Sequence, residues 1–277
     1  MNYIELRVEF SEVHPWRDIM IAQLGELGFE SFVETKTGLN SYIPETIFDA
    51  GIIDDLKEQQ GIANLDYSLI EDQNWNAKWE ENFEPVFVDD LLVIRAPFHS
   101  PDLKAKMVVT IQPQMSFGTG HHQTTWLMAK KLFELDLTGK EVLDMGTGTG
   151  VLAIVAEKLG AKKVFAPDID EWSFRNALEN VALNNCEKIE VALGDDQTIK
   201  GRSFDLIIAN INKNVLIQHF SVYSECIKPG GMMLISGFFE TDQGDLKKEA
   251  GNHGFIFEET FTKDEWAMMQ FKAPNRI

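Results

Sequence analysis

Hydrophobic and polar positions divide the chain into a short first part and a longer second part. Within the first 71 residues, apolar side chains alternate with polar ones over 3–10 and recur at helical spacing over 15–27. The whole pattern predicts, in chain order, strand 3–10, helix 15–27, strand 30–35, strand 41–43, helix 46–59 and strand 65–70. This order indicates a small α+β domain of the ferredoxin-like type. Because the segment has no polar cluster of catalytic type, we expect residues 1–71 to recognise a partner rather than merely cover an edge of a larger domain.

Three aromatic residues mark the segment that follows. Trp75, Trp79 and Phe83 are spaced four apart, which places them on one face of a helix. An aromatic stripe of this kind more often packs on a neighbour than forms a binding surface. Short strands are predicted after this helix, at 85–96 and 106–112. We therefore interpret residues 72–116 as a linker made of a helix and short strands.

Strand and helix patterns alternate regularly from residue 140 onward. Strands are predicted at 141–145, 162–167, 188–193, 204–210, 231–236, 254–261 and 265–272. The last two follow each other without a helix between them, so the final strand is expected to run antiparallel inside an otherwise parallel sheet. Residues 117–277 are therefore predicted to form an α/β domain around a seven-stranded sheet.

Composition narrows the class of protein. With 277 residues, 44% of them apolar, the chain is long enough to bury two cores. The net charge of −19 counts against a nucleic-acid substrate and favours a basic partner. The sequence has no membrane-span run and no signal-sequence pattern, so we expect a cytoplasmic protein without a membrane partner. Cys186 and Cys226 lack ligand spacing, which predicts free thiols, and the lack of a long apolar seam favours a monomer.

The most informative chemistry lies in the segment Glu141–Gly150, where a short apolar strand runs into three alternating glycines. Such a turn lets the backbone approach a nucleoside cofactor closely. The next strand ends near Asp168, whose carboxylate can accept bonds from the hydroxyls of a ribose. The spacing does not fit the dinucleotide pattern G-x-G-x-x-G, because Val151 follows the third glycine. This misfit disfavours a nicotinamide cofactor.

Several segments together resemble one family, the methyltransferases that modify large-subunit ribosomal protein eleven. These enzymes are class I S-adenosylmethionine-dependent methyltransferases with a Rossmann-like sheet. The resemblance runs over nearly the whole chain. It is carried by the Trp-rich segment Asn74 to Val86, the loop Phe117 to Thr125, the turn Asp144 to Gly150, the run Pro167 to Asp170 and the segment Phe204 to Ile211.

The resemblance implies a set of site residues. It implies that S-adenosyl-L-methionine is contacted by Thr125 in the loop, Gly146 in the turn, Asp168 after the second strand and Asn210 after the fourth. Asp195, which follows Gly194, is a weaker candidate near the adenine. We also hypothesise that Asn210 orients the amine that accepts the methyl group.

Two neighbouring histidines, His121 and His122, are more simply explained by a structural role than by a metal site. His121 and His122 point apart and have no third ligand at metal spacing, so fixing the loop is favoured over binding zinc. The family more often has threonine followed by His-Pro where this chain has His121-His122-Gln123. This difference leaves the roles of His121 and Gln123 open.

The resemblance implies methylation of lysine side chains and of the N-terminal amine of the ribosomal protein. The segment after the fourth predicted strand, Asn210-Ile-Asn-Lys213, offers no aromatic ring to stack a planar group, which favours flexible aliphatic amines. Alternatives are a lysine methyltransferase that acts on another basic protein or a small molecule, a nicotinamide-dependent oxidoreductase, and a cofactor-binding module without catalysis.

Overall fold

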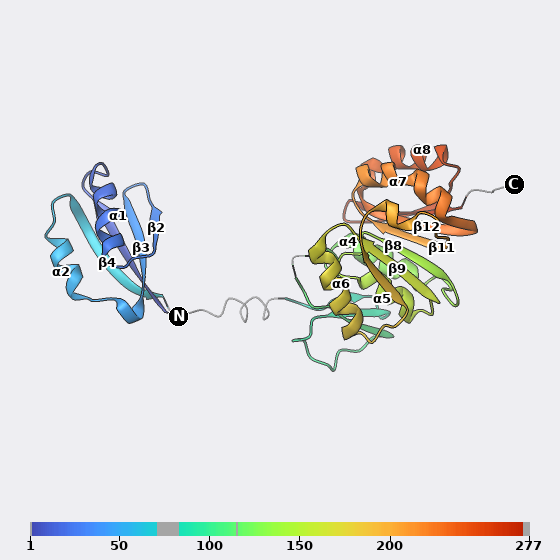
Figure 1. Cartoon of the computed structure of the whole chain (residues 1–277), viewed down its shortest axis with the longest axis horizontal. Helices are drawn as coiled ribbons and strands as arrows, with labels where there is room; N and C mark the ends of the chain where they lie inside the picture. Colours follow the sequence, from blue (N-terminus) through green and yellow to red (C-terminus); the bar gives the residue numbers. More distant parts are fainter. Residues whose placement is uncertain (1, 71–82, 115, 274–277) are drawn as a thin grey trace. The chain divides into compact units, whose positions relative to one another are not determined.

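The computed structural model describes residues 2–70, 83–114 and 116–273. Contacts group the chain into two units, Met1–Asn82 and Phe83–Ile277 (Figure 1). The described residues 83–114, placed by the sequence pattern in a linker, group with the second unit. Trp75 and Trp79 of the predicted aromatic helix lie outside the described residues.

The first unit consists of four strands and two α-helices in its described part. The elements are β1 (Tyr3–Phe10), α1 (Trp16–Glu26), β2 (Ser31–Glu34), β3 (Gly38–Pro44), the 3-10 turn η1 (Glu45–Ile47), α2 (Gly51–Lys57) and β4 (Ile62–Ile70). The strands form an antiparallel sheet in the order β2-β3-β1-β4. Alternate residues of β1 are buried against side chains such as Leu24 and Leu56 of the two helices, which makes one face of the sheet the core.

Two expected elements of this unit differ from the structure. The strand expected at 41–43 is longer, because β3 pairs with β1 over its whole length from Gly38 to Pro44. The helix expected at 46–59 begins only at Gly51. The Asp49 carboxylate accepts a hydrogen bond from the Gly51 amide at 2.9 Å, and this local turn interrupts the helix.

The second unit contains a small sheet and a large sheet. Its elements are β5 (Val86–Val88), β6 (Leu92–Arg95), β7 (Met107–Thr110), α4 (Gln123–Leu132), β8 (Glu141–Met145), α5 (Val151–Lys158), β9 (Lys163–Asp168), α6 (Glu171–Leu183), β10 (Ile189–Leu193), η2 (Asp196–Ile199), β11 (Phe204–Asn210), α7 (Lys213–Cys226), β12 (Ile227–Phe239), η3 (Glu240–Asp242), α8 (Gln243–Asn252), β13 (Ile256–Lys263) and β14 (Trp266–Lys272).

The large sheet is mixed. In the described residues its strand order is β10-β9-β8-β11-β12-β14-β13. The five strands from β10 to β12 are parallel, whereas β14 runs antiparallel to both β12 and β13. The chain therefore ends in the antiparallel hairpin that the absence of an intervening helix predicts.

Helices cover both faces of this sheet (Figure 1). One apolar cluster joins α4, α5 and α6 to the sheet through side chains such as Met128, Ile154 and Val181. The other joins α7 and α8 to the opposite face through Phe220 and Leu246. The sheet is thus buried on both sides, which explains why its parallel strands are nearly continuous apolar runs.

The strand expected at 85–96 is instead a hairpin. β5 and β6 pair antiparallel, and the turn between them places Asp89 at φ 48, a left-handed conformation that aspartate tolerates. β7 adds to β6 in parallel to complete a three-stranded sheet. Cys186 has a free thiol, as expected, and the buried Cys226 thiol donates to the Ile199 carbonyl at 3.2 Å. None of the helices that the structure describes is long and apolar enough to cross a bilayer.

Candidate active site

The order of the parallel strands reverses between β8 and β11. From β8 the chain proceeds outward to β9 and β10, and then returns to place β11 on the other side of β8. Ligands of open α/β sheets bind at the carboxyl ends of the strands where the order reverses in this way. Met145, Asp168 and Asn210 are the last residues of β8, β9 and β11, so the predicted site residues Asp168 and Asn210 lie at this edge.

The glycine turn after β8 has a conformation that requires glycine. Gly146, Gly148 and Gly150 have φ values of 71, 56 and 82 degrees, in the left-handed region. A Cβ atom on Gly148 would lie 2.2 Å from the carbonyl oxygen of Phe117. The same carbonyl accepts a hydrogen bond from the Thr149 amide at 2.9 Å, so the loop that begins at Phe117 packs directly on the turn.

Asp144 fixes this turn from inside the protein. Its Oδ2 accepts hydrogen bonds from Thr147 Oγ1 at 2.7 Å and from the Ala153 amide at 3.1 Å. The side chain is buried, and burial raises its pKa to about 6, against the two hydrogen bonds that favour the carboxylate. Asp144 therefore shapes the turn rather than facing a ligand.

Asp168 contacts the same turn from β9. Its Oδ2 accepts a hydrogen bond from the Gly148 amide at 2.8 Å, and its Oδ1 accepts one from the Asp170 amide at 3.0 Å. A carboxylate has about four acceptor positions. Each oxygen therefore retains capacity for another donor, such as one of two neighbouring hydroxyl groups.

Thr125 and Asn210 lie side by side, although 85 positions separate them in the sequence. Asn210 Nδ2 is 3.5 Å from Thr125 Oγ1, at the limit of a hydrogen bond. Asn210 Oδ1 is buried, and no described residue donates to it. An unpaired buried oxygen is costly unless a ligand donates to it. The structure thus brings the predicted residues of α4 and β11 together around an open acceptor.

A buried asparagine that sequence reasoning did not identify supports the glycine turn. Asn180 on α6 donates from Nδ2 to the Thr149 carbonyl at 2.9 Å and accepts from the Gln112 amide at 2.7 Å. Asn184, one helical turn later, accepts from the Thr110 amide and donates to the Thr110 carbonyl. The only signal in the sequence is the recurrence of asparagine at every fourth position of α6, which does not show what these side chains contact.

The two histidines fix the loop before α4, as the sequence favoured. His121 Nε2 is 2.9 Å from the Glu84 carbonyl oxygen, and its ring contacts Phe83. His122 is the N-cap residue of α4 and accepts from the Thr124 amide. Burial lowers the pKa of His122, which favours the neutral ring that this acceptor role requires.

Aromatic rings continue from this loop to an acidic cavity. The ring of His122 contacts Phe117 at 5.1 Å and Trp266 at 4.4 Å between centroids, and Trp266 contacts Phe239 at 4.2 Å. A cavity of about 330 Å³ is lined by Phe239, Glu240, Thr241 and Glu265. Since Ser236 of β12 pairs with Asn210, this cavity lies a few residues beyond Asn210 along the neighbouring strand.

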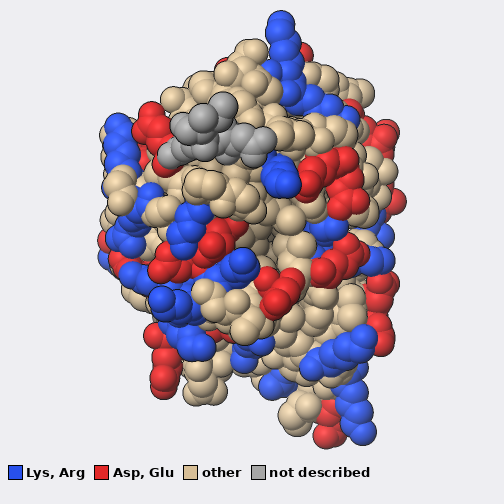
Figure 2. Space-filling model, turned by 90° about the vertical axis from the view of Figure 1, so that its right-hand side faces the viewer, with Lys and Arg blue, Asp and Glu red and all other residues tan. Residues whose placement is uncertain are grey.

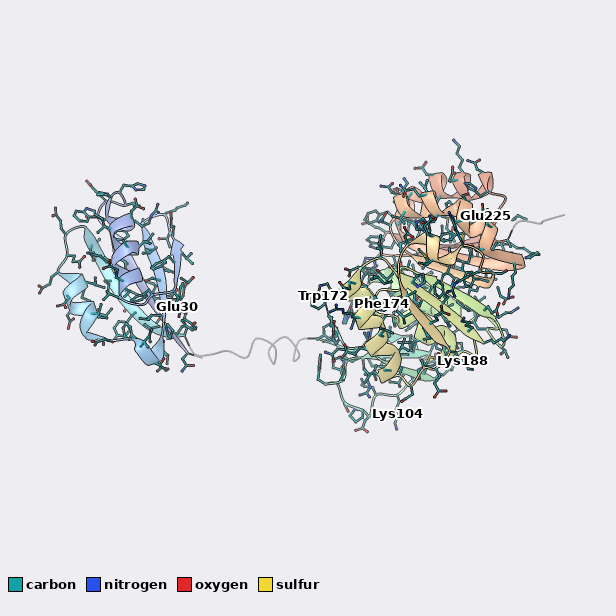
Figure 3. All side chains as sticks on the ribbon, in the orientation of Figure 1. Glu30, Lys104, Trp172, Phe174, Lys188 and Glu225 are labelled. Atoms are coloured by element: carbon teal, nitrogen blue, oxygen red, sulfur yellow. The ribbon has the colours of Figure 1, made fainter. Side chains whose placement is uncertain are left out.

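Exposed apolar side chains surround the carboxyl end of β9. Ile169, which directly follows Asp168, is 76% exposed. Trp172, near the start of α6, is 68% exposed (Figure 3). Leu193, which pairs with Asp168, is half exposed. Asp195 caps the turn η2 by accepting from the Gln197 amide at 2.9 Å, so one of its oxygens is already engaged. The side chains of Ile169, Trp172 and Leu193 provide apolar surface on which a flat ring can pack near Asp168.

Comparison with known proteins identifies the family. The profile of "Ribosomal protein L11 methyltransferase (PrmA)" matches residues 14–274. The ribosomal protein L11 methyltransferase of Bacteroides fragilis is 40% identical over 98% of this chain and 99% of that protein. The protein of the same name from Porphyromonas gingivalis is 45% identical over 92% of this chain and 90% of its own length.

Solved structures show the same fold. The crystal structure of the ribosomal protein L11 methylase from Lactobacillus delbrueckii subsp. bulgaricus superposes with a TM-score of 0.64 and 27% identity, covering 70% of this chain and all of that one. A methyltransferase from Pyrococcus furiosus, 19% identical, superposes with a TM-score of 0.52 over 59% of this chain and 88% of that one. The expected α/β methyltransferase fold with a mixed central sheet is confirmed. The chain therefore belongs to the ribosomal protein L11 methyltransferase family, which consists of S-adenosylmethionine-dependent protein methyltransferases.

Proposed function

We propose that this chain transfers methyl groups from S-adenosyl-L-methionine to amino groups of large-subunit ribosomal protein eleven, namely lysine side chains and the N-terminal amine. We further propose that Thr125, Gly146, Asp168 and Asn210 hold the cofactor. The observation that carries the proposal is the open acceptor Asn210 Oδ1 beside Thr125, at the same sheet edge as Asp168.

The residues present fit the cofactor. Asp168 has acceptor capacity for both ribose hydroxyls, and Ile169 and Leu193 offer apolar surface for the adenine. Gly146 has no side chain that would block the methionine portion; a Cβ there would already lie 2.4 Å from Ile211 Cγ2. When bound, S-adenosylmethionine supplies an electrophilic methyl group. The chain has to hold an amine in line with it and exclude water.

The amine must lose its proton before it reacts. A lysine with an ordinary pKa near 10.4 needs about 4.6 kcal/mol for deprotonation at pH 7. Desolvation lowers this cost, and Asn210 Oδ1 can accept a hydrogen bond from the neutral amine and orient its lone pair. The side chain of Asn212 has a structural role instead, because its Oδ1 accepts from the Val215 amide and caps α7.

The acidic cavity beyond Asn210 suits the approach of a lysine. Glu240 and Glu265 favour an ammonium group at the cavity, and the rings of Phe239 and Trp266 offer a cation–π surface for its later methylated forms. The chain's net charge of −19 draws a basic protein inward.

The strand order of the first unit supports a ferredoxin-like domain, to which we assign recognition of the ribosomal protein. We propose that the chain acts in the cytoplasm, because its proposed target is a ribosomal protein. We also propose that it is a monomer and that it makes no direct contact with nucleic acid. On the face drawn in Figure 2, basic side chains are interspersed with acidic ones instead of forming a continuous basic area.

Two measurements on Asn210→Ala test the site. We expect turnover on the ribosomal protein to fall by about tenfold or more, because a hydrogen bond that orients the reacting amine is lost. Calorimetric titration with S-adenosylmethionine separates a loss of cofactor binding from a loss of amine orientation. Unchanged turnover would refute the role of Asn210. Tight cofactor binding with no methylation of ribosomal protein eleven, but with methylation of another basic protein, would favour the alternative target.

A further inference from the structure

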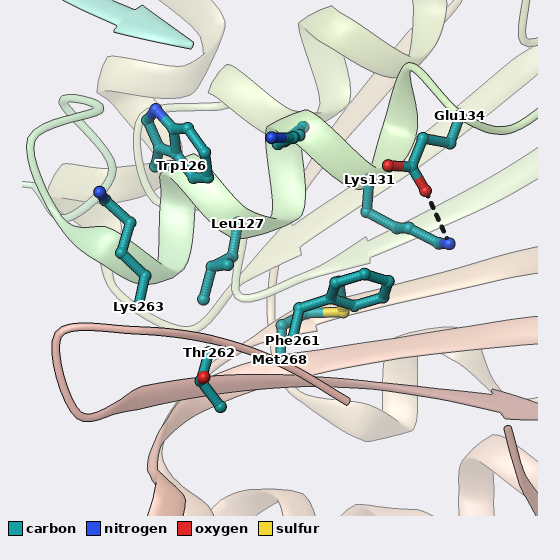
Figure 4. Close-up of a pocket in the computed structure, with 9 residues that line it drawn as sticks. Trp126, Leu127, Lys131, Glu134, Phe261, Thr262, Lys263 and Met268 are labelled. Carbon is teal, nitrogen blue, oxygen red and sulfur yellow. Dashed lines mark hydrogen bonds and ion pairs between the residues drawn. The ribbon is translucent and has the colours of Figure 1, made fainter. Parts of the chain in front are cut away.

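A second cavity, of about 490 Å³, lies between α4 and the β13–β14 hairpin (Figure 4). Its apolar wall is formed by Leu127, Phe261 and Met268. None of the four proposed cofactor residues lines it. The volume falls within the range of small-molecule sites, roughly 300–1,000 Å³.

Two lysines converge on one ring at the rim of this cavity. The ammonium of Lys130 lies 4.9 Å from the centroid of the Trp126 ring, and that of Lys263 lies 4.7 Å from the same centroid. The indole is held in place because its Nε1 donates to the Phe87 carbonyl at 3.0 Å. The ring is therefore a fixed platform that gathers two positive charges.

These positive charges are only partly neutralised. Lys130 forms an ion pair with Asp89 at 2.9 Å. Lys263 has no carboxylate partner among the described residues, although the chain carries 44 acidic against 25 basic side chains. At the other end of the cavity, by contrast, Lys131 is paired with both Glu134 and Glu259.

We propose that this cavity binds a small organic anion. A phosphate or carboxylate head group would lie at the Trp126 ring, beside the ammonium of Lys263 and near that of Lys130, where it would accept charge-assisted hydrogen bonds. An apolar or flat body would pack on Leu127, Phe261 and Met268, whose surfaces gain from being removed from water. The residues that line this cavity include none of the four proposed cofactor residues and none of those that line the acidic cavity.

Calorimetric titration of the full chain tests the proposal. Two probes, phenyl phosphate and phenylacetate, have both an anionic head group and an aromatic ring. Two others have one of these features each: inorganic phosphate has only the anionic group, and phenol has only the ring. We expect phenyl phosphate, phenylacetate or both to bind saturably, with the single-feature probes at least tenfold weaker. Preference between the first two tells whether the natural head group is a phosphate or a carboxylate. No saturable binding of either at millimolar concentration would overturn the proposal.

Charge variants show whether the lysines at the cavity are responsible. Lys263→Gln and Lys130→Gln should each weaken binding by about tenfold or more. Lys104→Gln is the matched control, because Lys104 is an exposed lysine (Figure 3) that does not line the cavity. An equal weakening by Lys104→Gln would contradict the proposal and indicate general attraction of anions. As a second readout, the indole N–H resonance of Trp126, assigned by its absence in Trp126→Phe, should shift on binding in the wild-type protein.

Discussion

Replacing Asn180 by alanine should damage both stability and cofactor binding. The change removes two hydrogen bonds, one from the Gln112 amide at 2.7 Å and one to the Thr149 carbonyl at 2.9 Å. Asn180 is fully buried, so alanine leaves both backbone groups without a partner. Each buried unsatisfied group costs about 1–3 kcal/mol, and the loss of stability for the two groups is therefore about 2–6 kcal/mol.

Thermal unfolding of the second unit gives the first readout. For a unit of this size, 1 kcal/mol shifts Tm by about 2–4 °C, so we expect a decrease of at least about 4 °C. The second readout is the affinity for S-adenosylmethionine. Because the Thr149 carbonyl belongs to the glycine turn, we expect the cofactor Kd to rise by about tenfold, equivalent to about 1.4 kcal/mol spent on ordering the turn.

Asn184→Ala is the matched control for this prediction. Asn184 is the C-cap residue of the same helix, is nearly as buried, and also bonds a backbone segment, at Thr110, but has no hydrogen bond to the glycine turn. It should lower Tm and leave the cofactor Kd nearly unchanged. If the two variants weaken cofactor binding equally, or if Asn180→Ala leaves Tm unchanged, the reasoning is refuted.

Two further predictions concern the turn itself. Burial raises the pKa of Asp144 to about 6 from 3.8, so the folded state binds more protons than the unfolded state between these pH values. The contribution of Asp144 to the free energy of unfolding should therefore fall by about 2 kcal/mol as pH rises from 4 to 6, and urea titrations should show this difference in slope between the wild-type chain and Asp144→Asn; equal slopes in the two proteins would contradict the assignment. Gly148→Ala should lower Tm far more than Gly139→Ala, because both glycines have positive φ but only a Cβ at Gly148 meets backbone, the Phe117 oxygen at 2.2 Å; equal effects would show that the close contact is unimportant.

Local patterns were sufficient to predict the parts of the fold that depend on neighbouring residues. The glycine turn follows from three glycines after an apolar strand, and the antiparallel β14 follows from the missing helix before it. The start of α2 was missed because a single Asp49 hydrogen bond interrupts an otherwise helical pattern. The turn between β5 and β6 was missed because its polar residues, Asp89 and Asp90, lie within a run that is otherwise apolar.

The site residues differ in the same way. A position that follows from the local sequence pattern could be predicted, whereas a contact between distant segments could not. The position of Asp168 at the carboxyl end of β9 was predictable, since the apolar strand pattern ends there. The role of Asn180 was not, because its partner Gln112 is 68 positions away and nothing in the sequence links the two. The cavity beside Trp126 likewise depends on α4 and β13, which only the folded sheet brings together.

The central claim is tested most directly by incubating the full chain with S-adenosylmethionine and unmodified ribosomal protein eleven, followed by intact-mass spectrometry. We predict mass increases in steps of about 14 daltons, the mass added by each methyl group, and their loss in Asp168→Ala, which removes the carboxylate that accepts from the Gly148 amide. Lys104→Gln, a change at an exposed lysine, should leave the increases intact. An unmodified mass with the wild-type chain, under conditions where calorimetry shows the cofactor bound, would contradict the account.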